Sequence, residues 1–96
     1  MTKAEIVNEI VTKTGIEKEV VSATVEAIMH TIKAEMSKGE NIYLRGFGTF
    51  LLKKRAEKMG RNITRNTAVK ISAHMIPAFK PAREFMSEVK TKVRVK

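Results

Sequence analysis

The first forty residues repeat apolar side chains with the period of an α-helix. From Ile6 to Val11 the apolar positions recur at intervals of three or four residues, which predicts one face of a short helix. Thr2 and Glu5 have the spacing of a capping box, in which the two side chains satisfy free N–H groups at a helix start. Gly15 is expected to end this helix in a left-handed conformation.

A second and longer helix is predicted between Glu17 and Gly39. Its apolar positions again recur every three or four residues, and glycine commonly follows the last turn of a helix. Two amphipathic helices joined by a tight turn form a hairpin with a broad apolar face. The positions on this second face are Val20, Val21, Thr24, Ala27, Ile28, Thr31, Ile32 and Met36.

The period changes to two after the second helix, which indicates β-strands. Ile42 and Leu44 share one face of a short strand, and residues 47–52 continue as a second strand. Gly46 and Gly48 predict a hairpin turn or a bulge where the two strands meet.

Residues 53–70 hold few apolar side chains and many basic ones, so this stretch has little with which to build a core. We expect a basic two-stranded ribbon that leaves the body of the protein, with a returning strand over residues 67–77. Pro81 suits the first position of a last helix, because proline has no N–H group to leave unsatisfied there. Residues 90–96 alternate basic residues with Thr and Val and are expected to form a frayed tail.

Ninety-six residues make a single domain, and a chain of this length buries only about 60% of the surface that it exposes when unfolded. The absence of Cys removes disulfides and thiolate metal sites as sources of stability. Oligomerisation is the remaining route. The chain shows neither an apolar signal core nor a run of about 18 apolar residues, so we expect a cytoplasmic protein with no membrane partner.

Charge is distributed unevenly along the chain. The net charge is +9, yet residues 1–40 hold five Lys and seven Glu, a net charge of −2, whereas residues 41–96 hold fourteen Lys and Arg and three Glu, a net charge of +11. We therefore expect the first part to assemble and the second part to bind a polyanion. Charge alone does not distinguish DNA from RNA or from an acidic membrane surface.

Catalytic chemistry has little support in the sequence. The chain has no Asp, Cys or Trp, and neither His30 nor His74 has neighbours suited to metal binding. The Gly46-Phe47-Gly48 run lacks the third glycine of a dinucleotide loop. We predict no enzyme activity, metal, cofactor or small-molecule substrate. The four phenylalanines lie in apolar patterns, which favours core packing over base stacking; they are Phe47, Phe50, Phe79 and Phe85.

The middle of the basic ribbon places one aliphatic residue, Ile63, between arginines. An exposed isoleucine at the end of a polar ribbon has no core to join, so we expect it to wedge between base pairs of DNA. The neighbouring Arg61, Asn62 and Arg65 would then lie in the minor groove and respond to its width and acceptors. A simple solvated charge run is the ordinary alternative, and Glu57 within the ribbon is compatible with it.

Four stretches together resemble the HU/IHF family of bacterial histone-like proteins, and the resemblance covers about residues 2–90. It implies an architectural protein of the nucleoid that binds double-stranded DNA through the minor groove and bends or compacts it, with low or moderate sequence specificity. The stretches are Arg45-Gly46-Phe47-Gly48-Thr49-Phe50, Arg55-Ala56, Gly60-Arg61-Asn62 and Ile76-Pro77-Ala78-Phe79-Lys80-Pro81.

The resemblance also implies the site residues. Ile63 stands at the arm tip where the family usually has an intercalating proline, and isoleucine lacks the rigid ring and fixed φ of proline. The Thr-Gly-Glu that usually follows the tip is replaced here by Arg65-Asn66-Thr67. The predicted DNA-binding set is Lys3, Arg45, Gly46, Lys53, Arg55, Lys58, Arg61, Asn62, Ile63, Arg65, Lys70, Lys80 and Arg83.

The predicted fold class is α+β. It has a helical hairpin over residues 1–40, a three-stranded antiparallel saddle over residues 41–80 with a two-stranded arm near residues 53–70, a C-terminal helix over residues 81–90 and a basic tail over residues 91–96. The resemblance implies an intertwined homodimer, with a heterodimer of related chains as an alternative. Two other functions stay open: a protein-interaction or regulatory module on the same fold, and a non-bending protein that coats DNA or RNA.

Overall fold

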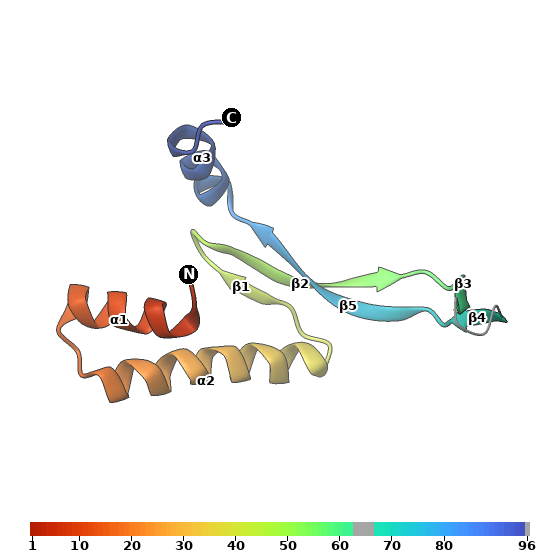
Figure 1. Cartoon of the computed structure of the whole chain (residues 1–96), viewed down its shortest axis with the longest axis horizontal. Helices are drawn as coiled ribbons and strands as arrows, with labels where there is room; N and C mark the ends of the chain where they lie inside the picture. Colours follow the sequence, from red (N-terminus) through yellow and green to blue (C-terminus); the bar gives the residue numbers. More distant parts are fainter. Residues whose placement is uncertain (63–66, 96) are drawn as a thin grey trace.

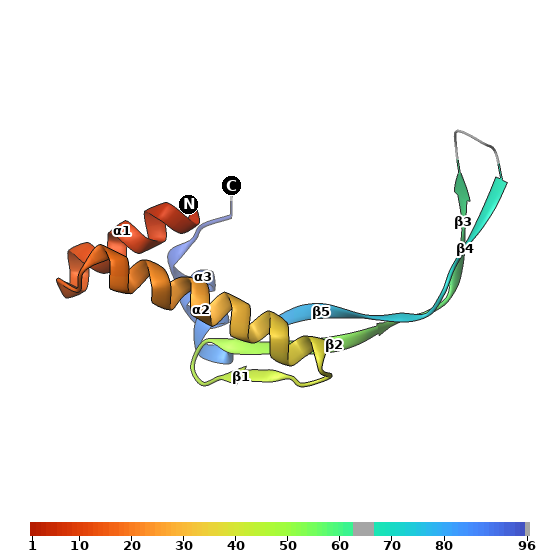
Figure 2. The same cartoon turned by 90° about the horizontal axis from the view of Figure 1, so that it is seen from below.

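A computed structural model describes residues 1–62 and 67–95, and the side chains of all of these except residues 58–62 and 67–71. The chain extends over 56 × 36 × 29 Å, and Figures 1 and 2 show that it is elongated because a ribbon projects from one end. The elements in chain order are α1 (Lys3–Thr14), α2 (Lys18–Ser37), β1 (Ile42–Leu44), β2 (Gly48–Arg55), β3 (Lys58–Asn62), β4 (Thr67–Ile71), β5 (His74–Pro81) and α3 (Arg83–Lys92).

Helices α1 and α2 form the predicted hairpin. The Thr2 hydroxyl oxygen accepts a hydrogen bond from the Glu5 N–H group at 3.3 Å, and Gly15 ends α1 with a φ of 73°. Val7 of α1 and Val21 of α2 are each only 4% exposed. Both caps and the apolar stripe are therefore confirmed.

Strands β1, β2 and β5 form a three-stranded antiparallel sheet with β2 in the centre. β2 pairs with β5 in an unbroken register from Gly48 to Arg55. The turn between β1 and β2 contains Gly46 with a φ of 80°, and the Phe47 N–H group donates to the Leu44 carbonyl at 2.9 Å. The structure therefore confirms the predicted α+β fold and its hairpin turn.

The two faces of this sheet differ. Side chains alternate along a strand, so Phe50, Leu52 and Pro77 share one side, where they line a cavity of about 610 Å³ together with residues of α2. We call this side the inner face and the opposite side the outer face. The inner face carries Phe50, Leu52, Lys54, Met75, Pro77 and Phe79, and the outer face carries Tyr43, Thr49, Leu51, Lys53, Arg55, His74, Ile76, Ala78 and Lys80.

The phenylalanines gather near the end of the sheet that leads into α3. The Phe79 ring centroid lies 5.2 Å from that of Phe47 and 4.8 Å from that of Phe50, and Phe47 stacks on Phe85 at 5.3 Å. A Cβ atom at Gly48 would lie 2.6 Å from the Phe79 ring, so glycine is required there for close packing. The four rings contact one another, as expected for side chains that pack rather than stack on bases, but Phe47 and Phe79 remain 47% and 38% exposed in the single chain.

Strands β3 and β4 form a separate two-stranded antiparallel ribbon, which we call the arm. Ala56 and Glu57 separate β2 from β3 and are not part of a strand. Ser72 and Ala73 separate β4 from β5 in the same way. The prediction of one continuous strand over residues 67–77 is therefore wrong. Both strands of the ribbon break at the same level, and this lets the arm turn away from the direction of the sheet, as Figure 2 shows.

The last helix begins later than predicted. Pro81 is not its first residue, because it pairs with Gly48 as the last residue of β5. The next residue, Ala82, donates its N–H group to the Phe47 carbonyl at 2.9 Å, which ties the end of β5 to the β1–β2 turn. Only after this bond does the backbone become helical, at Arg83.

The last helix also ends later than predicted, at Lys92, so the first residues of the predicted tail are helical. The Lys92 ammonium lies 3.0 Å from the Glu88 carboxylate, one turn earlier. The Val93 N–H group donates to the Val89 carbonyl at 2.9 Å. These i,i+4 contacts extend the helix by about half a turn beyond residue 90.

The core of the single chain is thin. Among the side chains whose burial is described, the buried hydrophobic ones are Val7, Val21 and Met36. Large apolar side chains such as Ile28 and Phe47 are about half exposed. Within the described ranges, no helix combines the length and the apolar character that a membrane crossing requires.

Candidate nucleic-acid interface

Three of the predicted DNA-binding residues lie on the outer face of the sheet, two toward the arm and one at the opposite end. Lys53 and Arg55 are on β2 and Lys80 is on β5, and all three are exposed. No ion pair joins any of them to a described carboxylate. Their positive charge therefore faces solvent on the side of the sheet that α2 does not cover.

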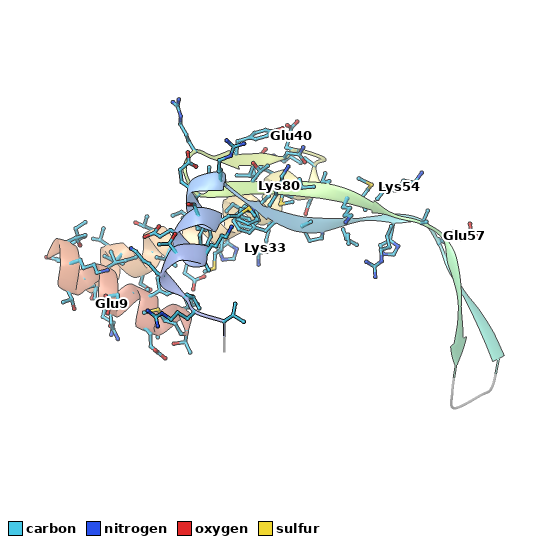
Figure 3. The ribbon with its side chains drawn as sticks, turned by 90° about the horizontal axis from the view of Figure 1, so that it is seen from above. Glu9, Lys33, Glu40, Lys54, Glu57 and Lys80 are labelled. Atoms are coloured by element: carbon cyan, nitrogen blue, oxygen red, sulfur yellow. The ribbon has the colours of Figure 1, made fainter. Side chains whose placement is uncertain are left out.

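Four predicted residues meet at one end of the sheet, although they come from two distant parts of the sequence. Arg45 and Gly46 lie in the β1–β2 turn, and Lys80 and Arg83 lie where β5 leads into α3. All four line a hollow of about 500 Å³, which we call the rim hollow. The hydrogen bond from Ala82 to Phe47 holds the two segments together at this point. Figure 3 shows Lys80 beside the start of α3.

The rim hollow also contains two hydroxyl residues that the sequence analysis did not select, Tyr43 and Thr49. Tyr43 pairs with Thr49 and Thr49 pairs with Lys80, so the three lie in a row across the strands. Tyr43 is 74% exposed. Hydroxyl groups of this kind donate to phosphate oxygens. The period-two pattern already placed Tyr43 opposite the apolar positions, but its approach to Lys80 depends on the register of β5.

Lys3 lies apart from the other predicted residues. It begins α1, and its ammonium forms an ion pair with the Glu26 carboxylate of α2. This hydrogen bond and the positive charge of Lys3 lower the pKa of Glu26 below its ordinary value of 4.5. Lys3 is therefore already engaged by a carboxylate within the chain, unlike the cations of the outer face.

The arm carries the rest of the predicted set. Lys58 pairs with Ile71, Asn62 pairs with Thr67, and Arg61 and Lys70 also lie in the ladder. Ile63 and Arg65 lie outside the described residues, so their predicted roles at the tip stay predictions. The described part of the arm therefore contains four residues of the predicted set, Lys58, Arg61, Asn62 and Lys70.

The two histidines take part in local contacts only. The His30 Nε2 atom lies 3.7 Å from the Glu26 carboxylate, and the His74 Nδ1 atom lies 2.8 Å from the Ser72 carbonyl oxygen. Across the described side chains, no group of three or more His, Cys, Asp or Glu residues is placed to hold a metal ion.

Comparison with known proteins gives a consistent result. The sequence pattern of a family described as "Bacterial DNA-binding protein" matches residues 1–90. The SPbeta prophage-derived DNA-binding protein HU 2 of Bacillus subtilis (strain 168) is 36% identical over 92 residues, which is 96% of this chain and 100% of that protein. An integration host factor subunit alpha of Bdellovibrio bacteriovorus is 36% identical over 83 residues, which is 86% of this chain and 76% of that protein.

A solved structure agrees over nearly the whole chain. An Anabaena HU–DNA cocrystal structure matches with a TM-score of 0.87 at 32% identity, over 93% of this chain and 97% of that one. The two N-terminal helices, the three-stranded antiparallel sheet and the C-terminal helix belong to this shared fold. The chain therefore belongs to the bacterial HU/IHF family of DNA-binding proteins.

Proposed function

We propose that this architectural DNA-binding protein acts as a homodimer, holds duplex DNA on the outer faces of its two sheets and bends it from the minor groove with its two arms. The main support is that the cationic outer face of the sheet leads into the arm. Lys53 and Arg55 lie on the outer face at the end of β2, directly before the chain enters the arm. DNA that contacts these cations is therefore within reach of the arm.

The division of labour between sheet and arm follows from their chemistry. Exposed cations such as Lys53 and Lys80 favour phosphates of any sequence. A ribbon tip with Ile63 between arginines is suited to wedge into the minor groove. Bending a short duplex costs several kcal/mol by elastic estimates. The additional phosphate contacts that bent DNA makes with the protein offset this cost.

A second copy of the chain is the partner that best fits the apolar surface. Phe79 of the inner face is 38% exposed, and Ile28 of α2 is 52% exposed. The cavity between α2 and the inner face is lined mainly by apolar side chains such as Ile32 and Leu52. Burying such surface is the main favourable term in protein association. Dimerisation would complete the core and place two arms on one duplex.

Members of this family bind DNA and are not enzymes, in agreement with the sequence analysis. A bacterial protein of this kind acts on the nucleoid, and we propose the same location for this chain. A response to groove width gives DNA binding of low or moderate sequence specificity.

Energy transfer across an end-labelled, mixed-sequence duplex of a few helical turns tests the proposal. We expect a saturable rise in transfer as protein is added. The affinity should fall by about 10³ to 10⁵ between 50 and 200 mM salt if the dimer makes roughly 6 to 10 phosphate contacts. Ile63→Ala should reduce bending strongly and binding modestly. Ile16→Ala is the matched control, since Ile16 is exposed in the loop between α1 and α2.

The other outcomes separate the alternative functions. Tight binding with no rise in transfer would contradict bending and support a protein that coats DNA. Absence of binding at low salt would contradict the proposal as a whole and support a protein-interaction module. An equal effect of Ile63→Ala and Ile16→Ala would remove the wedge from the mechanism.

A further inference from the structure

A histidine that has no role in the proposed function lies at the base of the arm. His74 is the first residue of β5 and pairs with Arg55, the last residue of β2. It lies on the outer face of the sheet and is exposed. Because this pair ends the sheet on the side of the arm, DNA that runs from the outer face to the arm passes over it.

A hydrogen bond fixes which nitrogen of the His74 ring carries hydrogen. The Nδ1 atom lies 2.8 Å from the carbonyl oxygen of Ser72. A carbonyl oxygen only accepts hydrogen bonds, so Nδ1 carries a hydrogen and is the donor. In the neutral ring Nε2 therefore has no hydrogen, and it becomes a second donor when the ring takes up a proton. This proton is gained without loss of the contact to Ser72.

The charged residues that share the outer face with His74 near the arm are Arg55, directly opposite, and Lys53. The acidic residue of this region is Glu57, which has an interaction of its own, and Figure 3 shows it where the sheet gives way to the arm. Nearby positive charges disfavour a further one, and an anion placed among them would favour it. The arm adds two basic residues beyond the sheet, Lys58 and Lys70.

We propose that His74 is a proton-dependent phosphate contact, which takes up a proton when a DNA phosphate lies beside it and Arg55. Directly opposed residues of an antiparallel pair are about 5 Å apart, so both side chains reach one phosphate group. Arg55 contributes its charge at every physiological pH. His74 adds a charge and the Nε2 donor only after it has gained the proton, so the protein holds DNA more tightly in mildly acidic solution.

The inference rests on the proposed function, because it needs duplex DNA on the outer face. It adds that DNA binding and proton uptake are linked. If DNA favours the charged ring, then a lower pH must favour DNA binding by the same factor. The gain in affinity is complete below the pH at which the ring titrates in the free protein. It is lost as the pH rises through the higher value at which the ring titrates in the complex.

The test compares His74→Gln with His30→Gln in the full-length protein. Each variant loses one imidazole, but His30 lies on α2, where its Nε2 atom is 3.7 Å from the Glu26 carboxylate. Affinity for an end-labelled duplex is measured by fluorescence anisotropy at about pH 5 and about pH 8, the range in which histidine changes its charge. Each pH is combined with several salt concentrations. Energy transfer across the same duplex measures bending, and circular dichroism checks that each variant is folded at both pH values.

For the wild type we expect the slope of log affinity against log salt to be steeper at the lower pH. The difference should be about 0.9 for each new phosphate contact, or about 1.8 per dimer. It should persist in His30→Gln and vanish in His74→Gln. His74→Lys carries its charge at both pH values and should show the steep slope at both.

A purely structural role of His74, through its contact with Ser72, would act alike at both pH values. An equal loss of affinity in His74→Gln at the two pH values would therefore overturn the inference, as would a wild-type slope that does not change with pH. Wild-type bending would leave the proposed function intact in either case. Loss of wild-type binding at both pH values would overturn the proposed function and this inference together.

Discussion

The inner and outer faces of the three-stranded sheet are built by the same strands, yet their chemistry differs: the inner face is mainly apolar, and the outer face carries most of the charge beside a few apolar side chains. On β2, Phe50 and Leu52 point to the inner face, and Thr49 and Lys53 point to the outer face. Both faces are open in the single chain: Phe79 is 38% exposed on the inner side, and the outer cations face solvent.

The two faces are therefore complementary to different partners. An apolar face gains free energy by excluding water, so another apolar surface such as that of a second copy suits it. A cationic face gains by releasing counterions from a polyanion. Adjacent residues of one strand point to opposite faces, so the same strand contributes to assembly and to DNA binding. Substitutions of adjacent residues should therefore separate the two functions.

The largest expected effect is on the inner face. Phe79→Ala removes the ring that contacts Phe47 and Phe50, and we expect a loss of about 3 to 5 kcal/mol in the free energy of unfolding. This range applies to a well-buried ring, so it requires a second copy to cover Phe79. Thermal unfolding at two protein concentrations measures both the loss and its dependence on association.

Lys80→Gln is the control, because Lys80 follows Phe79 but lies on the outer face. It should change the free energy of unfolding by less than about 0.5 kcal/mol. A small, concentration-independent effect of Phe79→Ala would mean that the inner face has no apolar partner.

The second effect is on the outer face. Lys53→Gln should weaken DNA binding and lower the salt slope by about 0.9 per lost phosphate contact, with unfolding unchanged. Lys54→Gln is the matched control, because Lys54 is the next residue and points to the inner face. Figure 3 shows Lys54 on the part of the sheet that leads toward the arm. Equal slopes for the two variants would show that DNA binding depends on the total charge of this segment. The face of the sheet on which each lysine lies would then not matter.

The smallest effect lies away from both faces, at the ion pair between Lys3 and Glu26. Because the folded chain lowers the pKa of Glu26, this group stabilises the fold at pH values above its ordinary pKa of 4.5. That stabilisation is lost as the pH falls through the lower pKa of the folded state. Glu26→Gln should therefore destabilise slightly at neutral pH and converge with the wild type in acid.

Urea unfolding of both proteins between neutral and acidic pH measures this convergence. A gap between the two proteins that persists at a pH where all carboxylates are protonated would mean that Glu26 acts through packing rather than charge. The glutamate carboxyl resonance, followed by NMR, gives its pKa directly.

Much of the fold could be predicted from the sequence because the relevant signals are local. Capping at Thr2 and Gly15 depends on a few neighbouring residues, and the change from helical to alternating period needs no distant partner. The segregation of charge was likewise readable by counting. The low apolar content of residues 53–70 predicted the arm itself. The resemblance to known DNA-binding proteins added its role, which these residues alone left open between a binding surface and a solvated charge run.

The errors fall where two distant segments meet. Pro81 has the local properties of a helix start, but pairing with Gly48 keeps it in β5. The strand predicted over residues 67–77 breaks at Ser72, where no strong turn signal stands. In both cases contacts between segments outweigh the local preference.

The positions of apolar and charged residues and the period with which they repeat can be read from the sequence, because these properties belong to the side chains and their spacing. Which charges lie close together depends on how the chain folds. The register of β2 with β5 brings Thr49 to Lys80, and the bond from Ala82 to Phe47 places Arg83 beside Arg45 in the rim hollow. Lys3, equally basic in the sequence, is instead held by Glu26. Which side chains lie close together depends on the pairing of strands and helices that are far apart in the sequence, and the linear pattern of residues does not show this pairing.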